Sequence, residues 1–253
     1  MPRRKRFQNL SFNRMIPNML TLMALTAGLT AIRFALDGRW EHATLAIVAA
    51  GILDALDGRI ARLLKGASKF GAELDSLSDF VCFGVSPALV LYLWTMRDAG
   101  KLGWVLVMLF AICCGLRLAR FNVMLEDPDA PVWKNRFFTG IPAPMGGGLV
   151  LLPMVFSFQV GEEFFRQPWI AGVFLLALAA AMVSTVPTYS FKGVKISRKW
   201  ILPTMLITGG VAVSMLNAPW ISLSVIGVAY IATIPFSIRA HRALVKTENG
   251  NNS

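Results

Sequence analysis

Four aspartates stand in two stretches that are otherwise rich in apolar and small residues: Asp54, Asp57, Asp75 and Asp79. A charge at the centre of a membrane helix costs at least about 2.5–3.5 kcal/mol, so carboxylates in apolar segments indicate a functional site. Four facing carboxylates repel one another unless cations or protons lie between them. Oxygen ligands suit Mg²⁺ or Mn²⁺, and two such ions would balance four negative charges. Paired metal ions of this kind clamp the attacking and leaving oxygens in phosphoryl displacement.

Each aspartate pair falls on one face of its helix, because residues three and four positions apart are neighbours on a helix surface. The first face also carries Gly58, Ala61 and Arg62, and the second carries Gly71, Cys82 and Ser86. A short connection joins the two stretches, so we expect antiparallel neighbouring helices. The small residues allow close approach of backbones or a ligand, and Arg62 and Lys69 suit an anionic phosphate.

Two other interpretations of the aspartates remain open. They could form structural ion pairs with Arg59, Arg62, Arg117 and Arg120. They could also line a cation or proton pathway, in which case we would expect broken helices in repeated halves. No such repeat is visible in the sequence.

The composition indicates that these helices lie in a membrane. Of the 253 residues, 55% are hydrophobic and only 15% are charged, whereas a soluble domain carries about 25% charged residues. The formal net charge of +11 would suggest nucleic acid in a soluble protein. In a membrane protein it reports topology and contact with anionic lipid, so we expect no nucleic-acid partner.

A spanning helix needs roughly 20 apolar residues, and the sequence offers eight candidates. They are 17–36, 41–62, 73–95, 102–124, 142–160, 168–187, 200–216 and 218–237. We therefore predict an all-α polytopic membrane protein with a basic N-terminal segment (1–16), one integral membrane catalytic domain (17–240) and a polar C-terminal tail (241–253).

The distribution of basic residues predicts the orientation. With eight spans, both termini and the connections around residues 63–70, 125–141 and 188–199 lie on one side. That side collects 20 of the 25 lysines and arginines. The positive-inside rule then places both termini, and the connection between the two aspartate helices, in the cytoplasm. We expect a bacterial-type inner membrane, with the site facing the cytoplasm.

The stretch from Asp54 to Asp79 reads D-x2-D-G-x2-A-R-x8-G-x3-D-x3-D. It resembles, without a mismatch, the signature of the CDP-alcohol phosphotransferase family. The resemblance implies a six-helix core with additions, two divalent metal ions and a homodimer. It also implies that Asp54 and Asp75 bridge both metals, that Asp57 completes one metal site and Asp79 the other, and that Asp79 acts as general base.

The same resemblance assigns contacts with the CDP-lipid. Gly58, Arg62 and Ser68 match positions that contact the cytidine diphosphate. The segment Pro17-Asn18-Met19-Leu20 resembles the nucleotide-contacting start of the first helix. For Asn18 a helix cap at the membrane interface is an equally good interpretation.

Stretches outside the signature resemble the branch of this family that uses CDP-diacylglycerol and L-serine. They are Asp79-Phe-Val-Cys-Phe-Gly-Val-Ser-Pro-Ala-Leu89, Arg117-Leu-Ala-Arg-Phe-Asn122, Phe138-Thr-Gly-Ile-Pro-Ala-Pro144 and Thr185-Val-Pro-Thr-Tyr-Ser-Phe-Lys192. A serine carboxylate needs a cation, for which Arg117 and Arg120 are candidates, with Asn122 beside them; as an alternative, these arginines flank the membrane and contact lipid phosphate. Glycerol 3-phosphate, inositol phosphate or choline remain alternative acceptors.

Overall fold

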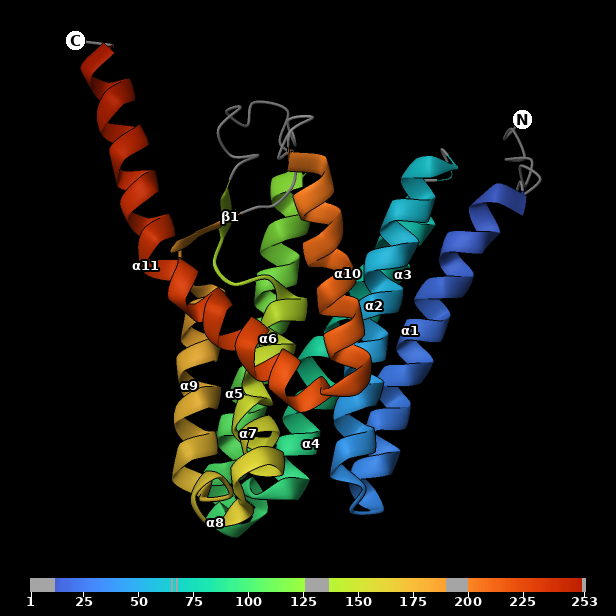
Figure 1. Ribbon diagram of the computed structural model, residues 1–253, viewed down its shortest axis with the longest axis vertical. Coiled ribbons are helices and arrows are strands. Elements are labelled where there is room, and N and C mark those ends of the chain that lie inside the picture. The colour runs from blue at the N-terminus through green and yellow to red at the C-terminus, as the bar shows by residue number, and fades with distance from the viewer. Residues whose placement is uncertain (1–11, 65, 67, 126–136, 190–199, 252–253) are drawn as a thin grey trace, which may run out of the picture.

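The computed structural model describes residues 12–64, 66, 68–125, 137–189 and 200–251, and these form a bundle of long helices (Figure 1). Helix α1 (Phe12–Leu36) and helix α2 (Trp40–Leu63) form an antiparallel pair joined by a tight turn at Gly38, whose φ is +71°. Glycine favours this turn because a left-handed backbone is strained for other residues.

The third expected span is a composite of three helical pieces. Helix α3 (Lys69–Asp79) passes directly into a π-helical turn, η1 (Phe80–Val85), and then into α4 (Ser86–Trp94). A short 3₁₀ turn, η2 (Met96–Ala99), leads into α5 (Gly100–Leu125). The aspartates Asp75 and Asp79 lie in the α-helical part, and the wider turn follows immediately after Asp79.

Among the described residues, the second half of the chain adds five helices of 4 to 17 residues and one, α11, of 33 residues. They are α6 (Ala143–Val150), α7 (Leu152–Val160), α8 (Glu162–Phe165), α9 (Pro168–Val183), α10 (Ile201–Asn217) and α11 (Pro219–Asn251). Helix α11 continues through the residues 241–251, where the sequence suggested a separate polar tail. Helix α1 begins and α11 ends at the same end of the bundle (Figure 1).

Every predicted span lies mainly in helix, although the prediction 168–187 runs past the end of α9 at Val183 and reaches β2. Not all of these helices have the length and composition of a membrane span. Five helical stretches among the described residues do: 15–36, 69–94, 96–124, 143–160 and 219–239. Helices α9 and α10 are apolar but shorter, and α2 carries two aspartates and two arginines in its second half. The chain is thus a polytopic membrane protein with at least five helices able to cross, and the count of eight stays a prediction.

The described residues include two short strands, which the all-α prediction missed. Strands β1 (Phe137–Thr139) and β2 (Pro187–Tyr189) pair antiparallel with Phe138 opposite Thr188. Gly140 follows β1 with a φ of +79°, and a Cβ at that position would lie 2.5 Å from the carbonyl oxygen of Met182. The strand pair therefore lies against the end of α9, where any side chain at position 140 would collide.

Helix α1 is the element against which the carboxylate-bearing helices pack. It runs along α2 and also contacts α3, η1 and α4. The contact is close because a Cβ at Gly28 would lie only 2.7 Å from Cys82 Sγ. Ser78 donates a hydrogen bond to the carbonyl oxygen of Thr21 (3.3 Å), and the Cys82 thiol donates to that of Ala24 (3.3 Å). These contacts fix α3 and η1 against α1.

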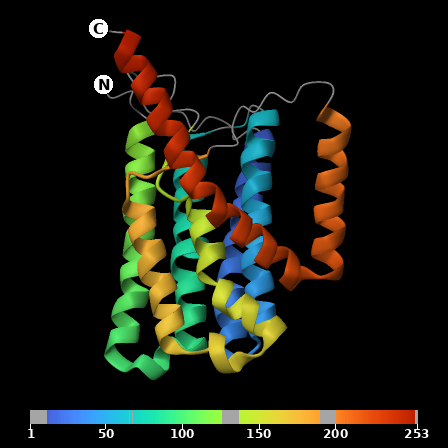
Figure 2. The same cartoon turned by 60° about the vertical axis from the view of Figure 1, so that its left-hand side comes forward.

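Helices α10 and α11 are attached differently. In the view of Figure 2, α10 stands apart from the bundle and α11 crosses obliquely over it. Helix α11 contacts α7 and β2, and Gln159 of α7 donates to the Ser224 hydroxyl of α11 (2.7 Å). Helix α10 makes its main contact with α11. Its apolar side chains, among them Leu206 and Leu216, are largely exposed.

Candidate active site

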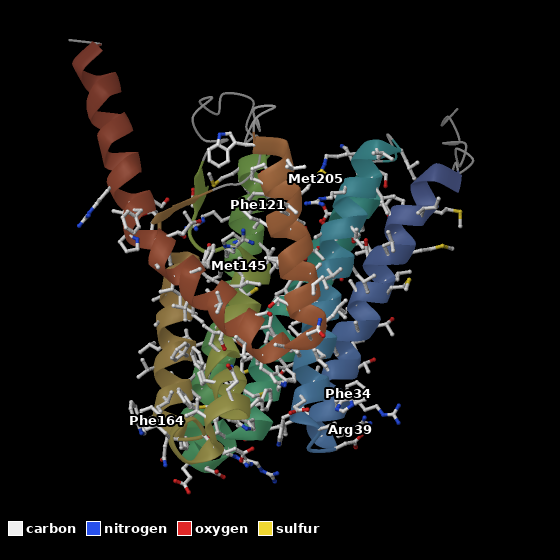
Figure 3. The ribbon with its side chains drawn as sticks, in the orientation of Figure 1. Phe34, Arg39, Phe121, Met145, Phe164 and Met205 are labelled. Carbon is white, nitrogen blue, oxygen red and sulfur yellow. The ribbon has the colours of Figure 1, made fainter. Side chains whose placement is uncertain are left out.

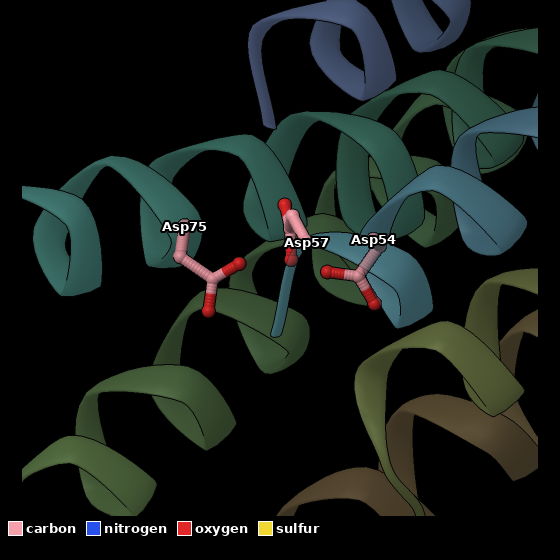
Figure 4. Close-up of side chains that lie close together, drawn as sticks. All are labelled: Asp54, Asp57 and Asp75. Atoms are coloured by element: carbon pink, nitrogen blue, oxygen red, sulfur yellow. The ribbon is translucent and has the colours of Figure 1, made fainter. Parts of the chain in front are cut away.

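Three of the four predicted carboxylates converge between α2 and α3. Each of Asp54, Asp57 and Asp75 offers an oxygen atom, and these three atoms all lie within 4.8 Å of one another (Figure 4). Asp57 is buried, whereas Asp54 and Asp75 are partly exposed. The sequence-based prediction that the two helices present these side chains to one another is confirmed for this trio.

Asp79 lies one helical turn beyond Asp75 and joins the trio through Asp54. The carboxyl groups of Asp54 and Asp79 lie within hydrogen-bonding distance of each other. The Oδ1 atom of Asp79 is buried and has no hydrogen-bond partner among the described residues. A buried acceptor without a partner is costly, so this oxygen is available to a ligand or a proton.

The carboxylates are not neutralised by ion pairs within the described part of the chain. The arginines that the sequence offered as partners form no salt bridge with Asp54, Asp57, Asp75 or Asp79 there; the salt bridge in that part joins Arg166 to Glu162 at 2.5 Å. The interpretation of the aspartates as structural ion pairs is therefore wrong for the described residues. A cluster of acidic groups in an apolar bundle then needs cations or protons from outside.

Sequence reasoning missed Thr21, which orients one of the carboxylates. Its hydroxyl donates a hydrogen bond of 2.6 Å to Asp57 Oδ2 and also lies 3.1 Å from the carbonyl oxygen of Pro17, one turn earlier in α1. Thr21 is buried. In the sequence it is one hydroxyl among several in an apolar helix. Only the packing of α1 against α2 distinguishes it from Thr26 and Thr30, which bond to backbone of their own helix.

The structure brings together two of the predicted nucleotide-contacting residues at the start of α3. Ser68 caps this helix, and its Oγ accepts a hydrogen bond from the Gly71 N–H (3.0 Å). A Cβ at Gly71 would lie 2.8 Å from Asn18 Oδ1 and 3.1 Å from Ser68 Oγ. Asn18 thus faces Gly71 from within α1, and its interpretation as a helix cap is wrong because α1 begins at Phe12.

The other residues assigned to the CDP-lipid differ in how exposed they are. Pro17 is buried inside α1, Leu20 is partly buried and Met19 is exposed. Gly58 lies directly after Asp57, and the Arg62 side chain one turn later is exposed. Asp54 lies about 14 Å along the helix before the end of α2, and Asp75 lies about 9 Å after the start of α3. The carboxylates are therefore deeper in the bundle than the point where Asn18 and Ser68 meet.

The three residues predicted to hold the acceptor have different surroundings. Arg120 donates four hydrogen bonds to backbone carbonyl oxygens, of Val183 (2.7 Å), Thr139 (3.1 Å), Ser184 (3.1 Å) and Met182 (3.4 Å). It thereby satisfies carbonyls at the end of α9 that have no partner within the helix. The side-chain amide of Asn122 donates to Ser76 Oγ (2.9 Å).

Arg117, one turn earlier on α5, is only 6% exposed and lies over the ring of Phe121, with 5.6 Å between the guanidinium carbon and the ring centroid. Its Nε atom is buried without a hydrogen-bond partner among the described residues. The same arginine lies close enough to Asp79 for their charges to interact. Two arginines of similar sequence context thus differ, because Arg120 donates to four backbone carbonyls, whereas the buried Nε of Arg117 has no partner among the described residues.

The donor set fits a divalent metal. Carboxylate oxygens are the ligands that Mg²⁺ and Mn²⁺ prefer, three of them can reach one point, and no cationic side chain in the described residues occupies that point. A cluster of this kind could bind a metal and position a phosphate-containing ligand, with Ser68 and Asn18 on the side of the α3 start.

The sequence is similar to two family models and to several proteins that share one name. The sequence model described as CDP-alcohol phosphatidyltransferase matches residues 14–186, and a second, CDP-alcohol phosphatidyltransferase 2, matches 199–235. A CDP-diacylglycerol–serine O-phosphatidyltransferase of Mycobacterium tuberculosis is 38% identical over 97% of this chain and 84% of its own length. Proteins of the same name from Helicobacter pylori (34% identical, 81% of this chain and 84% of the relative) and Bacillus subtilis (32% identical, 70% and 91%) are also similar.

Proposed function

This chain belongs to the CDP-alcohol phosphatidyltransferase family, and we propose that it transfers the phosphatidyl group of CDP-diacylglycerol to L-serine, giving phosphatidylserine and CMP. The observation that carries the chemistry is the convergence of Asp54, Asp57 and Asp75 on one point in an apolar bundle, with Asp79 adjacent. The names of the relatives, which span most of the chain, support serine as the acceptor.

The four aspartates would hold two divalent metal ions, Mg²⁺ or Mn²⁺. Asp54 and Asp75 would bridge them, with Asp57 completing one site and Asp79 the other. Bound there, the ions would supply stabilisation of negative charge on the phosphate and leaving oxygens. Thr21 keeps the Asp57 carboxylate oriented, which is the role of outer hydrogen bonds in metal sites.

The side chains divide the reaction between them. Asp79, with its free Oδ1, accepts the proton of the serine hydroxyl. The serine oxygen forms a bond to the phosphorus that bears diacylglycerol, and the phosphoanhydride bond to CMP breaks. Asn18 and Ser68, which meet at Gly71, contact the cytidine diphosphate together with Gly58 and Arg62. Holding both substrates in this geometry provides much of the rate enhancement.

An apolar cavity of about 160 Å³ begins one turn from the carboxylates and offers space for part of an acyl chain. Its lining includes Gly51 of α2, Phe83 of η1, Leu149 of α6 and Ile226 of α11. Gly51 precedes Asp54 by three residues and Phe83 follows Asp79 by four. A lipid with its headgroup at the aspartates could therefore extend its tail into this cavity without burying a polar group.

The orientation follows as part of the same proposal. Asp54 and Asp57 lie in the second half of α2 and Asp75 lies in α3, and α2 ends at the end of the bundle at which α1 begins and α11 ends (Figure 1). The distribution of basic residues supports a cytoplasmic location of that end. Serine would enter from the cytoplasm while the lipid stays in the inner membrane. The homodimer implied by the family resemblance stays a prediction.

The test uses purified protein in detergent with CDP-diacylglycerol and a single acceptor in each assay. We expect CMP release with L-serine and none above background with glycerol 3-phosphate, inositol phosphate, inositol or choline. Removal of metal with EDTA should abolish release, and Mg²⁺ or Mn²⁺ should restore it. Activity with a different acceptor alone would retain the chemistry and overturn the choice of serine, and full activity in EDTA would overturn the metal site.

A further inference from the structure

Six buried side-chain polar atoms have no hydrogen-bond partner among the described residues, and three of them belong to Arg117 and to two residues close to it. These three are Asp79 Oδ1, Arg117 Nε and the Tyr230 hydroxyl. They come from three separate elements, α3, α5 and α11. Unpaired buried polar groups are rare because each forfeits its hydrogen bonds to water. Three of them in one region indicate a ligand that brings the missing partners.

Arg117 connects these three residues. Its guanidinium lies close enough to both Asp79 and Tyr230 for their charges to interact. Phe121 covers one face of that guanidinium, and Figure 3 marks Phe121 in the upper part of the bundle, on the end of α5. The Tyr230 hydroxyl lies beside Thr188 of β2 without a hydrogen bond of normal geometry, and the Thr188 hydroxyl itself donates to the Gly140 carbonyl (2.8 Å).

We propose that Tyr230 of α11 and Arg117 of α5 together form the carboxylate-binding part of the acceptor pocket, so that α11 determines acceptor specificity. The inference rests on the proposed function. An amino acid with a side-chain hydroxyl has its carboxylate and its hydroxyl a short distance apart. The carboxylate pairs with the Arg117 guanidinium and accepts a second hydrogen bond from Tyr230. The hydroxyl then lies toward Asp79, which takes its proton.

The neighbouring arginine does not fill this role in the structure. The four bonds from Arg120 use both of its terminal nitrogens for the carbonyls of Thr139, Met182, Val183 and Ser184. It holds the end of α9 and the turn after β1 in place, and these elements carry Gly140, the acceptor of the Thr188 bond. Arg120 therefore stabilises the fold at the end of α9 and is not part of the proposed pocket.

Tyr230 lies outside the part of the chain that carries the carboxylates and matches the first family model. The first family model ends at residue 186, and Tyr230 falls within the second, which covers 199–235. The carboxylates and the nucleotide-contacting residues all precede residue 186. The pocket therefore combines the common chemistry with one wall from an additional helix, which is where a branch of the family can differ in its acceptor.

The experiment compares Tyr230→Phe with Tyr92→Phe, since Tyr92 lies toward the other end of α4 from the carboxylates and packs edge-to-face against Trp104 (ring centroids 5.1 Å apart). We expect Tyr230→Phe to raise the KM for L-serine by about tenfold, because a hydrogen bond to a charged group is lost, and to leave the KM for CDP-diacylglycerol within twofold. Arg117→Gln should raise the serine KM by a larger factor. Tyr92→Phe should change neither.

A second readout separates recognition of the carboxylate from a general loss of structure. L-Serinamide has the hydroxyl and the ammonium group of serine but no carboxylate. The preference of the wild-type protein for L-serine over L-serinamide, measured as a ratio of kcat/KM, should fall about tenfold in Tyr230→Phe. An unchanged ratio in a folded Tyr230→Phe variant overturns the inference. Absence of serine-dependent CMP release in the wild-type protein overturns the proposed function instead.

Discussion

The helices around the carboxylates and helix α10 represent two ways of holding a membrane helix in place. Around the carboxylates, backbones approach so closely that a methyl group at Gly28 or Gly71 would lie within 3 Å of a neighbouring side chain. Along α10, a methyl group at Gly209 or Gly210 would meet no atom within 4 Å, and Leu216 is 86% exposed. Close packing fixes polar groups to the accuracy that chemistry needs, whereas an exposed apolar helix is held by its solvent.

The largest expected effect on activity comes from changing a single carboxylate of the close-packed region, Asp79. Asp79→Asn keeps the size of the side chain but removes the proton acceptor, so kcat should fall by about 10²–10⁴-fold. The exposed Asp98 of η2 provides the control, and Asp98→Asn should retain full activity. Thermal unfolding in detergent checks that both variants remain folded. Substantial activity in a folded Asp79→Asn variant would contradict the assignment of Asp79 as the base.

The next prediction compares two threonines that both bond to a carbonyl four residues earlier. Thr21 also donates to Asp57 (2.6 Å), whereas Thr208 of α10 donates to the Thr204 carbonyl (2.8 Å) and to no other group among the described residues. Thr21→Val should raise the Mg²⁺ or Mn²⁺ concentration required for half-maximal activity by about 10–100-fold, as expected for an outer hydrogen bond of a metal site. Thr208→Val should leave that concentration unchanged. Thr21→Ser keeps the hydroxyl and should require the same metal concentration as the wild-type protein. If both valine variants required the same metal concentration, Thr21 would have no role in orienting a metal ligand.

Arg120 tests whether a charged residue near the site serves structure or substrate. Arg120→Gln removes bonds to four carbonyls and should lower the free energy of unfolding by about 1.5–3 kcal/mol. We expect the KM values for serine and CDP-diacylglycerol to change by similar factors, in contrast to Arg117→Gln. A rise confined to the serine KM would return Arg120 to the acceptor pocket, where the sequence alone had placed it.

Two glycines give the smallest expected effect. At Gly28 an added Cβ would lie 2.7 Å from Cys82 Sγ and 3.1 Å from Cys82 Cα. Gly28→Ala should therefore destabilise the protein by about 1–3 kcal/mol. At Gly209 the same change meets no neighbour, and Gly209→Ala should be neutral or stabilise by up to about 1 kcal/mol. Thermal unfolding of both variants in the same detergent measures the difference.

The local part of this structure could be predicted from the sequence. The helical segments follow from apolar length, and the spacing of Asp54, Asp57 and Asp75 places three carboxylates on facing helix sides. The meeting of Asn18 with Ser68 agrees with the family resemblance. These predictions depend on helical periodicity or on a fixed motif, and both are visible over short stretches of chain.

The parts that could not be predicted depend on contacts between distant segments. Thr21 and Tyr230 are a hydroxyl and a phenol in apolar helices, and only tertiary packing places them near Asp57 and Arg117. The strands β1 and β2 have three residues each and lie about fifty positions apart in the sequence. No local sequence pattern therefore predicts their pairing. The carbonyls that occupy Arg120 belong to residues more than sixty positions away, apart from Thr139.

The π-helical turn Phe80–Val85 has a consequence for how this protein can be altered. Such a turn holds one residue more than an α-helix would place there, and such turns often occur at functional sites. Deleting one residue from it would yield a regular helix and could even increase helical stability. Yet each residue accounts for about 100° of rotation, so Asp75 and Asp79 would turn away from α2 while α4 kept its packing. A shortened, smoother helix of this kind would be an inactive protein with an intact fold.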